Sequence, residues 1–532
     1  MQARRRHARH CRLVVAALII VTTLLFLTGD APGVFIDAPT RNLLVPPRRL
    51  PLSLGAVREA TRADAVLLPD WEVLLLLRPN ATAIAHNATC VFRGGASSPA
   101  RSLGTLPSSG RYAYTCAMPE PARRHQPFHA PRISPAAVDA VHVSPQHGEL
   151  AMMVRWSGRL VYDSVVLDGG DVLVFAKGVN PRQGVNRPAS DVRCVYYRGG
   201  SADDVVASLP AATSAQQVFR CPPPTVDHPP AMLRVTLGLA GEEEAIPSVA
   251  TYSPPARGAS HKRRHKICAC TMVRDVGKFL REWVSYHAAV GVERFILYDN
   301  GSEDDLSEQV RRLTAEGLDV TTLAWPWPKT QEAGFSHSAA VHREACEWMA
   351  FIDVDEFIFS PEWAASGSPS RSMLRSIVGV EAEVGQVSLG CVDFGPSGRS
   401  SHPAEGVTQG YTCRRRAVER HKSVVRVEAV DRSLVNSVHH FALREGKRSE
   451  WSRRARVNHY KFQAWEEFRV KFRRRVSAYV PDWTSRLNLQ SKDRTPGLGF
   501  DPVQPPGWAS KFCDLNDTLL RDVTRRWRRF ES

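Results

Sequence analysis

The chain of 532 residues exceeds what one hydrophobic core usually organises, so at least two domains are expected. With 43% hydrophobic and 23% charged residues it has the composition of a globular protein, which excludes a disordered or fibrous chain. Its formal net charge of +16 suits a membrane surface or an acidic polysaccharide as well as a nucleic acid. The sequence has no zinc-finger, RRM or KH pattern, so we expect no nucleic-acid partner.

The N-terminus predicts a membrane anchor. Five arginines in the first 12 residues precede an uncharged apolar run from Leu13 to Thr28. This run is short for a helix that spans a bilayer, which needs about 20 residues, but it fits the thinner early-secretory membranes. The basic flank keeps the N-terminus cytoplasmic. We expect a single-pass type II protein of the Golgi membrane, with a tail (1–12), an anchor (13–29) and a stem (30–66).

A cleaved signal peptide is the alternative to an anchor, although no clear A-x-A-like cleavage site precedes Pro32. Either reading places the rest of the chain in a lumen. Sequons at Asn80, Asn87 and Asn516 agree with that compartment, as do eleven cysteines, most of which should pair under oxidising conditions.

Residues 67–252 contain an internal duplication. Cys90 and Cys194 are 104 residues apart, Cys116 and Cys221 are 105 apart, and similar VFRGG and YYRGG segments follow the first cysteine of each pair. The matched spacing predicts the disulfides Cys90–Cys116 and Cys194–Cys221. Short apolar runs punctuated by glycine and proline predict an all-β, sandwich-like module. A sugar-binding module and a packing or spacer domain both remain open.

The hydrophobic period changes after a Pro/Ser/Gly-rich stretch at 253–266, where a second domain (265–532) begins. Apolar patterns predict alternating strands and helices, with strands at 266–273, 292–298, 318–325 and 348–357 and helices at 276–290, 304–317 and 332–348. Such alternation predicts an α/β fold with a parallel sheet, in which ligands bind at the carboxyl ends of the strands.

In the segment FIDVDEF, an otherwise apolar stretch at the end of the fourth expected strand contains three acidic residues, Asp353, Asp355 and Glu356. An ionised carboxylate is costly to bury without a partner. In a strand, residues i and i+2 point to the same side, so Asp353 and Asp355 would present oxygen ligands together. Such ligands suit Mg²⁺ or Mn²⁺ held jointly with a phosphate-bearing substrate.

Two other strand ends carry candidate residues. Asp299, in Tyr-Asp-Asn-Gly-Ser, either hydrogen-bonds a ribose or base or builds a turn, and both can hold at once. Glycosylation of Asn300 would block the pocket beside it, so we expect that sequon to stay unmodified. After the first strand, Arg274 could face a diphosphate, and Asp275 either joins that site or caps the next helix.

The motifs ACTMVRDVGKFLREWVSYHAAVGVERFILYDNGSEDD, WPWPKTQEAGFSH, EWMAFIDVDEF, FGPSG, GYTCRRRAVERHKSVVR, VHHF and VNHYKFQAWEEF together resemble plant members of glycosyltransferase family 92. The resemblance spans roughly residues 265–515. It implies a GT-A (Rossmann-like) fold, a UDP-sugar donor, Mn²⁺ (or Mg²⁺) and inversion at the anomeric carbon. Some members are pectic galactan galactosyltransferases with an N-terminal β-rich carbohydrate-binding module, which the duplicated region resembles in placement.

Carried onto this chain, the resemblance assigns Asp353 and Asp355 to the family's D-x-D motif. Asp355 is then the direct metal ligand, Asp353 is shared between metal and ribose, and Asp299 lies near the uridine. Families of this fold commonly add a C-terminal histidine to the metal site. His439 or His459 could fill that role, or be a structural residue.

The chemistry follows from charge. The leaving diphosphate gains negative charge, which the divalent ion stabilises with Arg274 or Lys422 in support. A carboxylate opposite the leaving group would deprotonate the acceptor hydroxyl, and Asp393 and Glu405 are the candidates. Three tryptophans could stack on sugars, although core packing is their default: Trp325, Trp327 and Trp465.

We therefore expect a metal-dependent inverting glycosyltransferase that moves galactose from UDP-galactose to a cell-wall polysaccharide such as β-1,4-galactan. The sugar is inferred from relatives alone. The alternative is a catalytically silent luminal protein that binds polysaccharide or nucleotide. A homodimer is left open.

Overall fold

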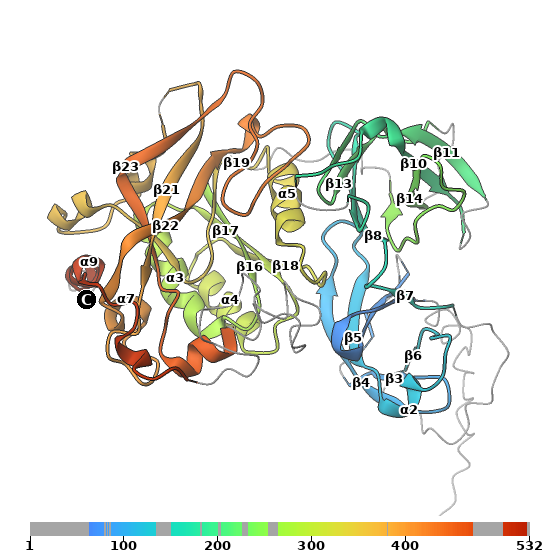
Figure 1. The fold of residues 1–532 in the computed structure, drawn as a ribbon, viewed down its shortest axis with the longest axis horizontal. Coiled ribbons are helices and arrows are strands. Elements are labelled where there is room, and N and C mark those ends of the chain that lie inside the picture. The colour runs from blue at the N-terminus through green and yellow to red at the C-terminus, as the bar shows by residue number, and fades with distance from the viewer. Residues whose placement is uncertain are drawn as a thin grey trace, which may run out of the picture. The chain divides into compact units, whose positions relative to one another are not determined.

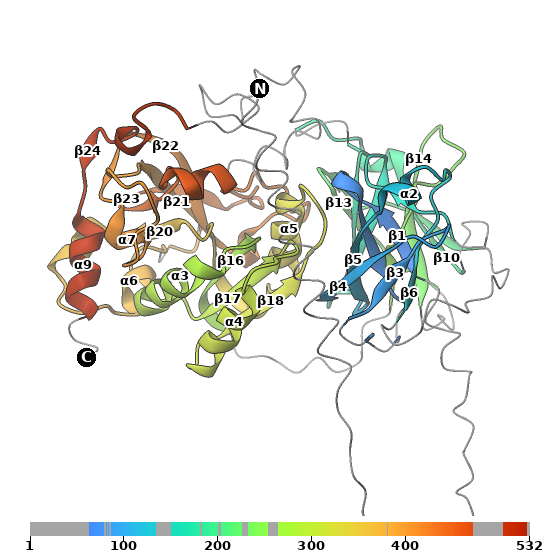
Figure 2. The same ribbon diagram turned by 90° about the horizontal axis from the view of Figure 1, so that it is seen from below.

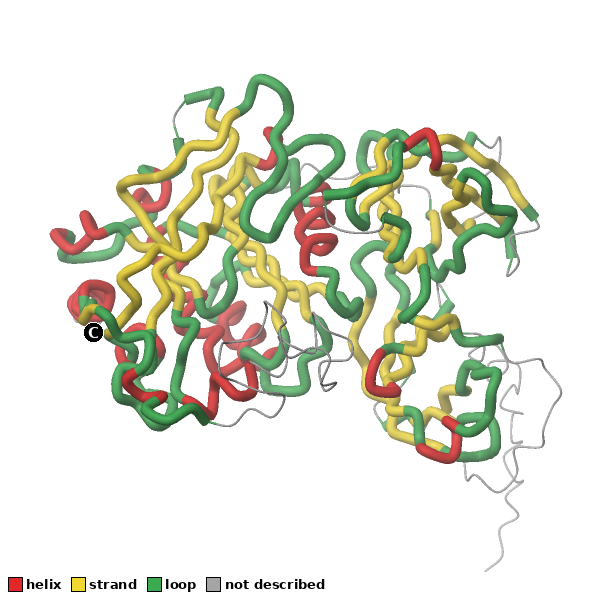
Figure 3. The backbone as a smooth tube through the Cα atoms, in the orientation of Figure 1, coloured by secondary structure: helices red, strands yellow, loops and turns green. Residues whose placement is uncertain are grey.

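The structure is a computed structural model (Figures 1 and 3) that describes most of the chain after residue 62. The predicted tail and anchor, and the stem up to residue 62, lie outside the described residues, as does Asn80. Among the residues that it describes, no helix is long and apolar enough to cross a membrane. The described residues all belong to one compact unit. The described residues are 63–78, 81, 83–84, 87–134, 151–180, 184–199, 204–225, 232–253, 264–379, 381–471 and 504–528.

The N-terminal module (described residues of 63–253) is built almost entirely of strands. One seven-stranded sheet has the order β6-β3-β4-β5-β2-β1-β7, and two four-stranded sheets have the orders β11-β10-β14-β15 and β12-β13-β9-β8. The strands of the first sheet are β1 (Asp64–Leu67), β2 (Glu72–Leu76), β3 (Thr89–Val91), β4 (Ser97–Thr105), β5 (Tyr112–Ala117), β6 (Arg132–Ser134) and β7 (Val154–Arg155). Those of the other two are β8 (Leu160–Val166), β9 (Val172–Lys177), β10 (Val192–Tyr197), β11 (Val205–Pro210), β12 (Thr213–Ala215), β13 (Val218–Cys221), β14 (Leu233–Leu239) and β15 (Thr251–Tyr252).

Both predicted disulfides of this module are confirmed. Cys90–Cys116 joins β3 to β5, and Cys194–Cys221 joins β10 to β13. Each bridge lies in a separate buried cluster of apolar side chains. The first half and the second half of the module therefore each have a core and a disulfide of their own.

The C-terminal domain (described residues of 264–528) contains a nine-stranded mixed sheet with helices packed against it (Figure 2). Along it the order is β18-β17-β16-β19-β22-β21-β23-β20, and β24 pairs with β22. The strands are β16 (His265–Val273), β17 (Arg294–Asp299), β18 (Val320–Ala324), β19 (Cys346–Phe351), β20 (Glu356–Phe359), β21 (Val384–Phe394), β22 (Cys413–Arg426), β23 (Arg448–His459) and β24 (Leu515–Asn516). The helices are α3 (Gly277–Val290), α4 (Leu306–Ala315), α5 (Gln331–Val341), α6 (Ser372–Arg375), α7 (Val407–Gly410) and α9 (Leu519–Arg528).

The predicted parallel sheet is confirmed for β16–β19, because β16 pairs in parallel with β17 and β19, and β17 with β18. Helix α3 follows from its apolar spacing, which buries Leu280, Trp283 and Val284 against the sheet. It ends at Gly291, whose φ of 129° is a conformation that glycine adopts readily. The two expected boundaries that differ most from the structure are the end of α5, at Val341, and the end of β19, at Phe351. The other boundaries agree to within two residues.

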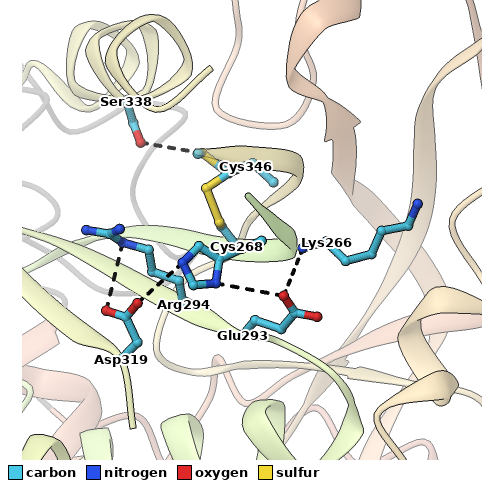
Figure 4. Close-up of a disulfide and its surroundings, with 9 residues drawn as sticks. Lys266, Cys268, Glu293, Arg294, Asp319, Ser338 and Cys346 are labelled. Carbon is cyan, nitrogen blue, oxygen red and sulfur yellow. Dashed lines mark hydrogen bonds and ion pairs between the residues drawn. A yellow bond between two sulfur atoms is a disulfide. The ribbon is translucent and has the colours of Figure 1, made fainter. Parts of the chain in front are cut away.

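A disulfide that the sequence did not reveal, Cys268–Cys346, joins β16 to β19 (Figure 4). It lies near the start of both strands, where charged side chains also gather: Glu293 accepts a hydrogen bond from the backbone N–H of Lys266 at 2.9 Å. The two strands are thus held together covalently at one end. A second such bridge, Cys413–Cys513, ties β22 to the segment before β24.

One hydrophobic cluster spans the module and the C-terminal domain. Trp327 packs against Trp156 and Tyr162 of the module, with ring centroids 5.9 and 5.1 Å away, and Trp325 packs edge-on against Phe175. Trp325 and Trp327 are fully buried, and Trp465 is buried in a smaller cluster near the C-terminus. All three tryptophans therefore belong to cores, which was their default interpretation.

Candidate active site

The order of the parallel strands contains one topological switch point. From β16 the chain proceeds to β17 and β18 on one side and then crosses to β19 on the other. Open α/β sheets bind ligands outside the carboxyl ends of their strands at such a point. Arg274 follows β16, and the D-x-D motif follows β19. The topology therefore places the predicted acidic motif at the edge of the sheet that suits a ligand.

The D-x-D motif is not in a strand, which corrects the predicted local structure. Strand β19 ends at Phe351, and a turn at Asp353–Glu356 is closed by a 2.9 Å hydrogen bond from the backbone N–H of Glu356 to the carbonyl of Asp353. The carboxylate of Glu356 accepts the backbone N–H of Asp353 at 2.9 Å. Asp353 and Asp355 therefore do not share a face by strand alternation, and they have different partners.

Asp353 is neutralised inside the protein. Lys422, on β22, donates to its Oδ2 at 2.9 Å and lies 3.1 Å from Oε2 of Glu356, and Gln331, the first residue of α5, donates to Oδ1 at 3.1 Å. Burial alone would raise the pKa of Asp353, but the ammonium of Lys422 outweighs it and lowers the pKa to about 2. Asp353 is therefore ionised at neutral pH, and its side chain is 36% exposed.

Lys422 does not have the predicted role beside a diphosphate, because its side chain is only 3% exposed and its ammonium binds two carboxylates. Burial would lower the pKa of Lys422, but Asp353 and Glu356 raise it. Burial in turn raises the pKa of Glu356, which is 2% exposed. This lysine is the partner that makes two of the three carboxylates of FIDVDEF tolerable in apolar surroundings.

Asp355 has a different environment. Its Oδ2 lies 3.4 Å from Nε2 of His459, the last residue of β23, and also contacts Lys471. The other ring nitrogen of His459, Nδ1, is 2.8 Å from Oδ1 of Asp393, whose Oδ2 accepts a 2.9 Å hydrogen bond from Lys461. Asp393 thus fixes the imidazole so that Nε2 faces Asp355.

Asp355 and His459 fit a divalent cation as a pair of ligands. A carboxylate beside an imidazole whose second nitrogen is bound by another carboxylate is the usual arrangement around protein-bound metals. Ligands bound at about 2.1 Å on adjacent octahedral positions are roughly 3 Å apart, close to the distance observed here. Lys471 would have to move its ammonium aside. The described residues contain no cluster of three or more acidic, histidine or cysteine ligands, so substrate or water would complete the coordination.

His439 does not join this pair. Its Nε2 lies 3.3 Å from a guanidinium nitrogen of Arg420, and its ring packs near that of His421 with centroids 6.0 Å apart. Burial and the charge of Lys422 lower the pKa of His439 to about 4. Of the two histidines proposed as ligands, His459 is the one that contacts the D-x-D motif.

Asp299 builds the turn after β17. Its Oδ1 accepts hydrogen bonds from the backbone N–H of Ser302 at 2.8 Å and from the Ser302 hydroxyl at 2.7 Å, and Gly301 takes a φ of 83°. The turn interpretation is therefore confirmed. A ribose or uracil contact through the remaining oxygen of Asp299 stays a prediction.

Asp275 bridges two loops instead of capping α3. Its Oδ1 accepts the backbone N–H of Glu303 at 2.6 Å, and its own N–H donates to the Ser302 hydroxyl at 3.0 Å. The cap of α3 is Asp304, which accepts the N–H of Gly277 at 2.7 Å across the two loops. Arg274 is exposed at the carboxyl end of β16, so its predicted position beside a diphosphate stays a prediction.

The side chain of Asn300 is engaged inside the protein. Its amide nitrogen donates to the carbonyls of Trp325 at 2.7 Å and Trp327 at 3.2 Å. A glycan on that nitrogen would replace one of its two N–H donors and so remove at least one of these hydrogen bonds, which supports the prediction that this sequon stays unmodified. Asn87 and Asn516, in contrast, are exposed.

Of the two predicted bases, Asp393 does not have the position that a base requires. Asp393 is 1% exposed and uses both oxygens to bind His459 and Lys461. Burial would raise its pKa, but these partners lower the pKa to about 2. Glu405 is exposed in the turn before α7, and the backbone N–H of Val407 in that helix binds Glu282 of α3. We therefore reassign Asp393 as a positioning residue for His459, and the role of Glu405 as a base stays a prediction.

Sequence reasoning missed the structural roles of Gln331, Asp304 and Lys461. Gln331 had a usable signal, because it is the first residue of the helix before β19, and helix N-termini and strand carboxyl ends meet at the same edge of an α/β sheet. Lys461 contacts Asp393 across 68 residues of sequence, and the sequence carries no local sign of that pairing.

The comparisons with known proteins agree on one family. Residues 263–492 match the model of glycosyltransferase family 92. A family 92 protein of Oryza sativa subsp. japonica is 38% identical over 491 residues, covering 87% of this chain and 80% of the relative. The chain belongs to glycosyltransferase family 92. This membership makes the protein a glycosyltransferase, as the motifs predicted.

Other relatives in the family are also from plants. One from Ricinus communis is 36% identical and covers 96% of this chain and 92% of its own length. One from Arabidopsis thaliana is 42% identical over 380 residues, which are 69% of this chain and 66% of the relative. The similarity to the relatives from Oryza sativa and Ricinus communis therefore includes the N-terminal module as well as the C-terminal domain.

Solved structures are more distant. A mannosyltransferase from Pyrobaculum calidifontis, in complex with GDP-Man and Mn²⁺, is 13% identical, covers 51% of this chain and 73% of its own, and has a TM-score of 0.27. A glucosyl-3-phosphoglycerate synthase from Mycobacterium tuberculosis, with Mn²⁺ and UDP, is 13% identical, covers 31% and 58%, and has a TM-score of 0.19. Similarity at this level does not establish a shared fold.

Proposed function

We propose that this family 92 protein is a metal-dependent, inverting glycosyltransferase of the GT-A type that uses a UDP-sugar, with UDP-galactose as the first donor to test. Its acceptor would be a cell-wall polysaccharide such as β-1,4-galactan. The observation that carries the proposal is the D-x-D turn at the switch point of the sheet, with Asp355 facing Nε2 of His459 at 3.4 Å.

Asp355 and His459 are the residues that would hold Mn²⁺ (or Mg²⁺). A divalent ion bound there supplies Lewis-acid stabilisation of the charge that develops on the departing diphosphate. Asp393 and Lys461 hold the His459 ring so that Nε2, not Nδ1, faces the site.

Asp353 contributes a fixed negative oxygen beside this ion. Lys422 keeps it ionised, and Gln331 orients its second oxygen. With 36% of its side chain exposed, Asp353 retains access to a ribose hydroxyl or a metal-bound water. Arg274 and Asp299, from the carboxyl ends of β16 and β17, would face the diphosphate and the nucleoside.

For localisation we propose a type II Golgi membrane protein whose module and C-terminal domain are luminal. The four disulfides among the described residues support an oxidising compartment, since such bridges are rare in the cytosol. Exposed sequon asparagines at positions 87 and 516 agree with the same compartment.

The test is a donor and acceptor screen with the full-length protein. Several UDP-sugars are offered with β-1,4-linked galacto-oligosaccharides, and UDP release and product mass are measured with Mn²⁺ and with EDTA. We expect Mn²⁺-dependent UDP release and a product one hexose heavier with UDP-galactose. Binding of UDP with no transfer from any donor would instead identify a silent binding protein.

A further inference from the structure

A turn of the N-terminal module has an unusual backbone conformation. Gln216, between β12 and β13, takes a φ of 53°, which few residues other than glycine adopt. Two asparagines hold it there: its N–H donates to Oδ1 of Asn186 at 2.8 Å, and its carbonyl accepts Nδ2 of Asn180 at 2.9 Å. A strained residue persists only where its surroundings fix it, and such residues cluster at functional positions.

The side chain of Gln216 leaves the module and binds the C-terminal domain. Its Nε2 donates to the carbonyl of Asn436 at 2.5 Å, and its Oε1 accepts the N–H of Asn436 at 3.1 Å. One side-chain amide thus pairs with both backbone groups of one residue. Asn436 is 2% exposed, so this contact is protected from water.

Asn436 transmits this contact to helix α5. Its Nδ2 donates to the carbonyl of Glu332 at 2.9 Å and to the Ser336 hydroxyl at 2.9 Å. The residue before Glu332 is Gln331, which donates to Asp353 at 3.1 Å. In Figures 1 and 2, β13 lies beside α5. A continuous path of hydrogen bonds and one peptide bond therefore connects Gln216 of the module with the D-x-D turn.

Further module contacts reach the same edge of the sheet. Arg220, on β13, donates to the carbonyl of Arg432 at 3.0 Å, at the start of the 431–441 loop that contains Asn436. Arg101, on β4, donates to the carbonyl of Ser302 at 3.2 Å, in the turn that Asp299 builds. The module therefore binds a loop on each side of the proposed donor site.

We propose that the β12–β13 hairpin is a positioning element of the donor site, in which Gln216 fixes the 431–441 loop and the start of α5 and thereby sets the position of Gln331 against Asp353. The inference rests on the proposed function for its effect on catalysis. The N-terminal module is on this account a part of the transferase site.

The adjacent residue supplies a matched control. Gln217 lies in the same turn, but its Oε1 accepts the Tyr162 hydroxyl at 2.9 Å, which is a contact within the module. Gln216→Ala removes an amide that crosses to the C-terminal domain, and Gln217→Ala removes one that does not. Both variants are compared in the full-length chain, with thermal unfolding as a check on the fold.

We expect Gln216→Ala to raise the KM for the UDP-sugar and the Kd for UDP with Mn²⁺ about 5- to 30-fold, the range for loss of a buried polar pair. The kcat should change much less, and Gln217→Ala should leave both constants near wild type. Equal KM values for the two variants, with the chain folded, would overturn the positioning role.

Hydrogen–deuterium exchange gives a readout that does not depend on transfer. Peptides covering 329–336 and 431–441 should exchange faster in Gln216→Ala than in wild type or Gln217→Ala. If the wild type transfers no sugar but shows this difference, the proposed function fails while the structural coupling stands. If the two variants exchange alike in these peptides, the coupling is refuted whether or not the protein transfers sugar.

Discussion

Two apolar segments of this chain each contain aspartate, and the surroundings of the aspartates differ in the two segments. In FIDVDEF, after β19, Asp353 is ionised because Lys422 binds it at 2.9 Å, and Asp355 faces His459 at the edge of the sheet where α/β proteins generally bind ligands. In LVYDSVV, on β8, Asp163 is 3% exposed and accepts hydrogen bonds from the backbone of Ser164 at 2.8 Å and from the Trp327 indole at 3.4 Å. Among the described residues, none forms an ion pair with Asp163.

The difference in partners decides the charge of each aspartate. Burial raises the pKa of Asp163 to about 7, whereas Lys422 overcomes the effect of burial at Asp353 and lowers that pKa to about 2. The nearby guanidinium of Arg111 is engaged with Asp64 at 2.6 Å. An acid within an apolar stretch is therefore not by itself evidence of a metal site, and its partners and its place at the sheet edge carry the distinction.

The largest effect that we expect is the loss of activity on changing Asp355. Asp355→Ala removes a proposed metal ligand, so we expect kcat to fall at least about 1000-fold, in the range of residues that stabilise charge in the transition state. The thermal midpoint should stay close to wild type. Asp163→Asn is the matched change at the other aspartate and should retain activity. The activity of both variants is measured as UDP release in the presence of Mn²⁺. A fully active Asp355→Ala would contradict the assignment of Asp355 as a metal ligand.

Lys422→Met should cost stability as well as activity. Removing one partner of a buried ion pair costs about 3–5 kcal/mol, because Glu356 and Asp353 lose their cation. The control is Lys266→Met, which breaks a 2.7 Å pair between Lys266, 42% exposed, and Glu347 and should cost less than about 1 kcal/mol. Urea unfolding compares the two. Similar losses would show that the Lys422 cluster is not a buried ion pair.

Asp163 predicts a dependence of stability on pH. The pKa of Asp163 is about 7 in the folded protein, which is above its value in the unfolded chain. Between these two pKa values the folded protein keeps the carboxyl proton that the unfolded chain has released. Stability should therefore fall as the pH rises from about 4 to about 7, by up to roughly 4 kcal/mol, and then level off. Asp163→Asn should remove most of this fall. An identical pH profile in wild type and variant would contradict the neutral Asp163.

Asp393→Asn should have the smallest effect of the four. The change keeps the shape of the side chain but weakens its hold on Nδ1 of His459, and such outer contacts are worth about 10- to 100-fold in metal affinity or activity. The loss should appear as a higher Mn²⁺ requirement that excess Mn²⁺ partly restores. If Asp393 were the base, excess Mn²⁺ would restore nothing.

The sequence predicted those parts of the molecule that depend on local pattern. Apolar spacing located β16 to β19 and the helices between them, and the D-x-D motif marked the edge of the sheet. Matched cysteine spacing gave Cys90–Cys116 and Cys194–Cys221. These features depend on neighbouring residues or on a repeat, so one chain is enough to see them.

The features that sequence reasoning missed depend on distant partners. Lys422 meets Asp353 across 69 residues, and Gln216 meets Asn436 across 220. The role of Lys422 was wrong because a basic residue in a motif does not reveal from the sequence which atoms its ammonium faces. The break of β19 at Phe351 was missed because Ile352 and Val354 continue the apolar run, while the turn is held by the side chain of Glu356.

The most direct test of this account is Mn²⁺ binding in the presence of UDP, measured by calorimetry on full-length wild type, Asp355→Asn and Asp163→Asn. We predict that wild type and Asp163→Asn bind Mn²⁺ with similar affinity and that Asp355→Asn loses most of the binding. Equal Mn²⁺ affinity in Asp355→Asn and wild type would contradict the claim that the D-x-D turn holds the cation.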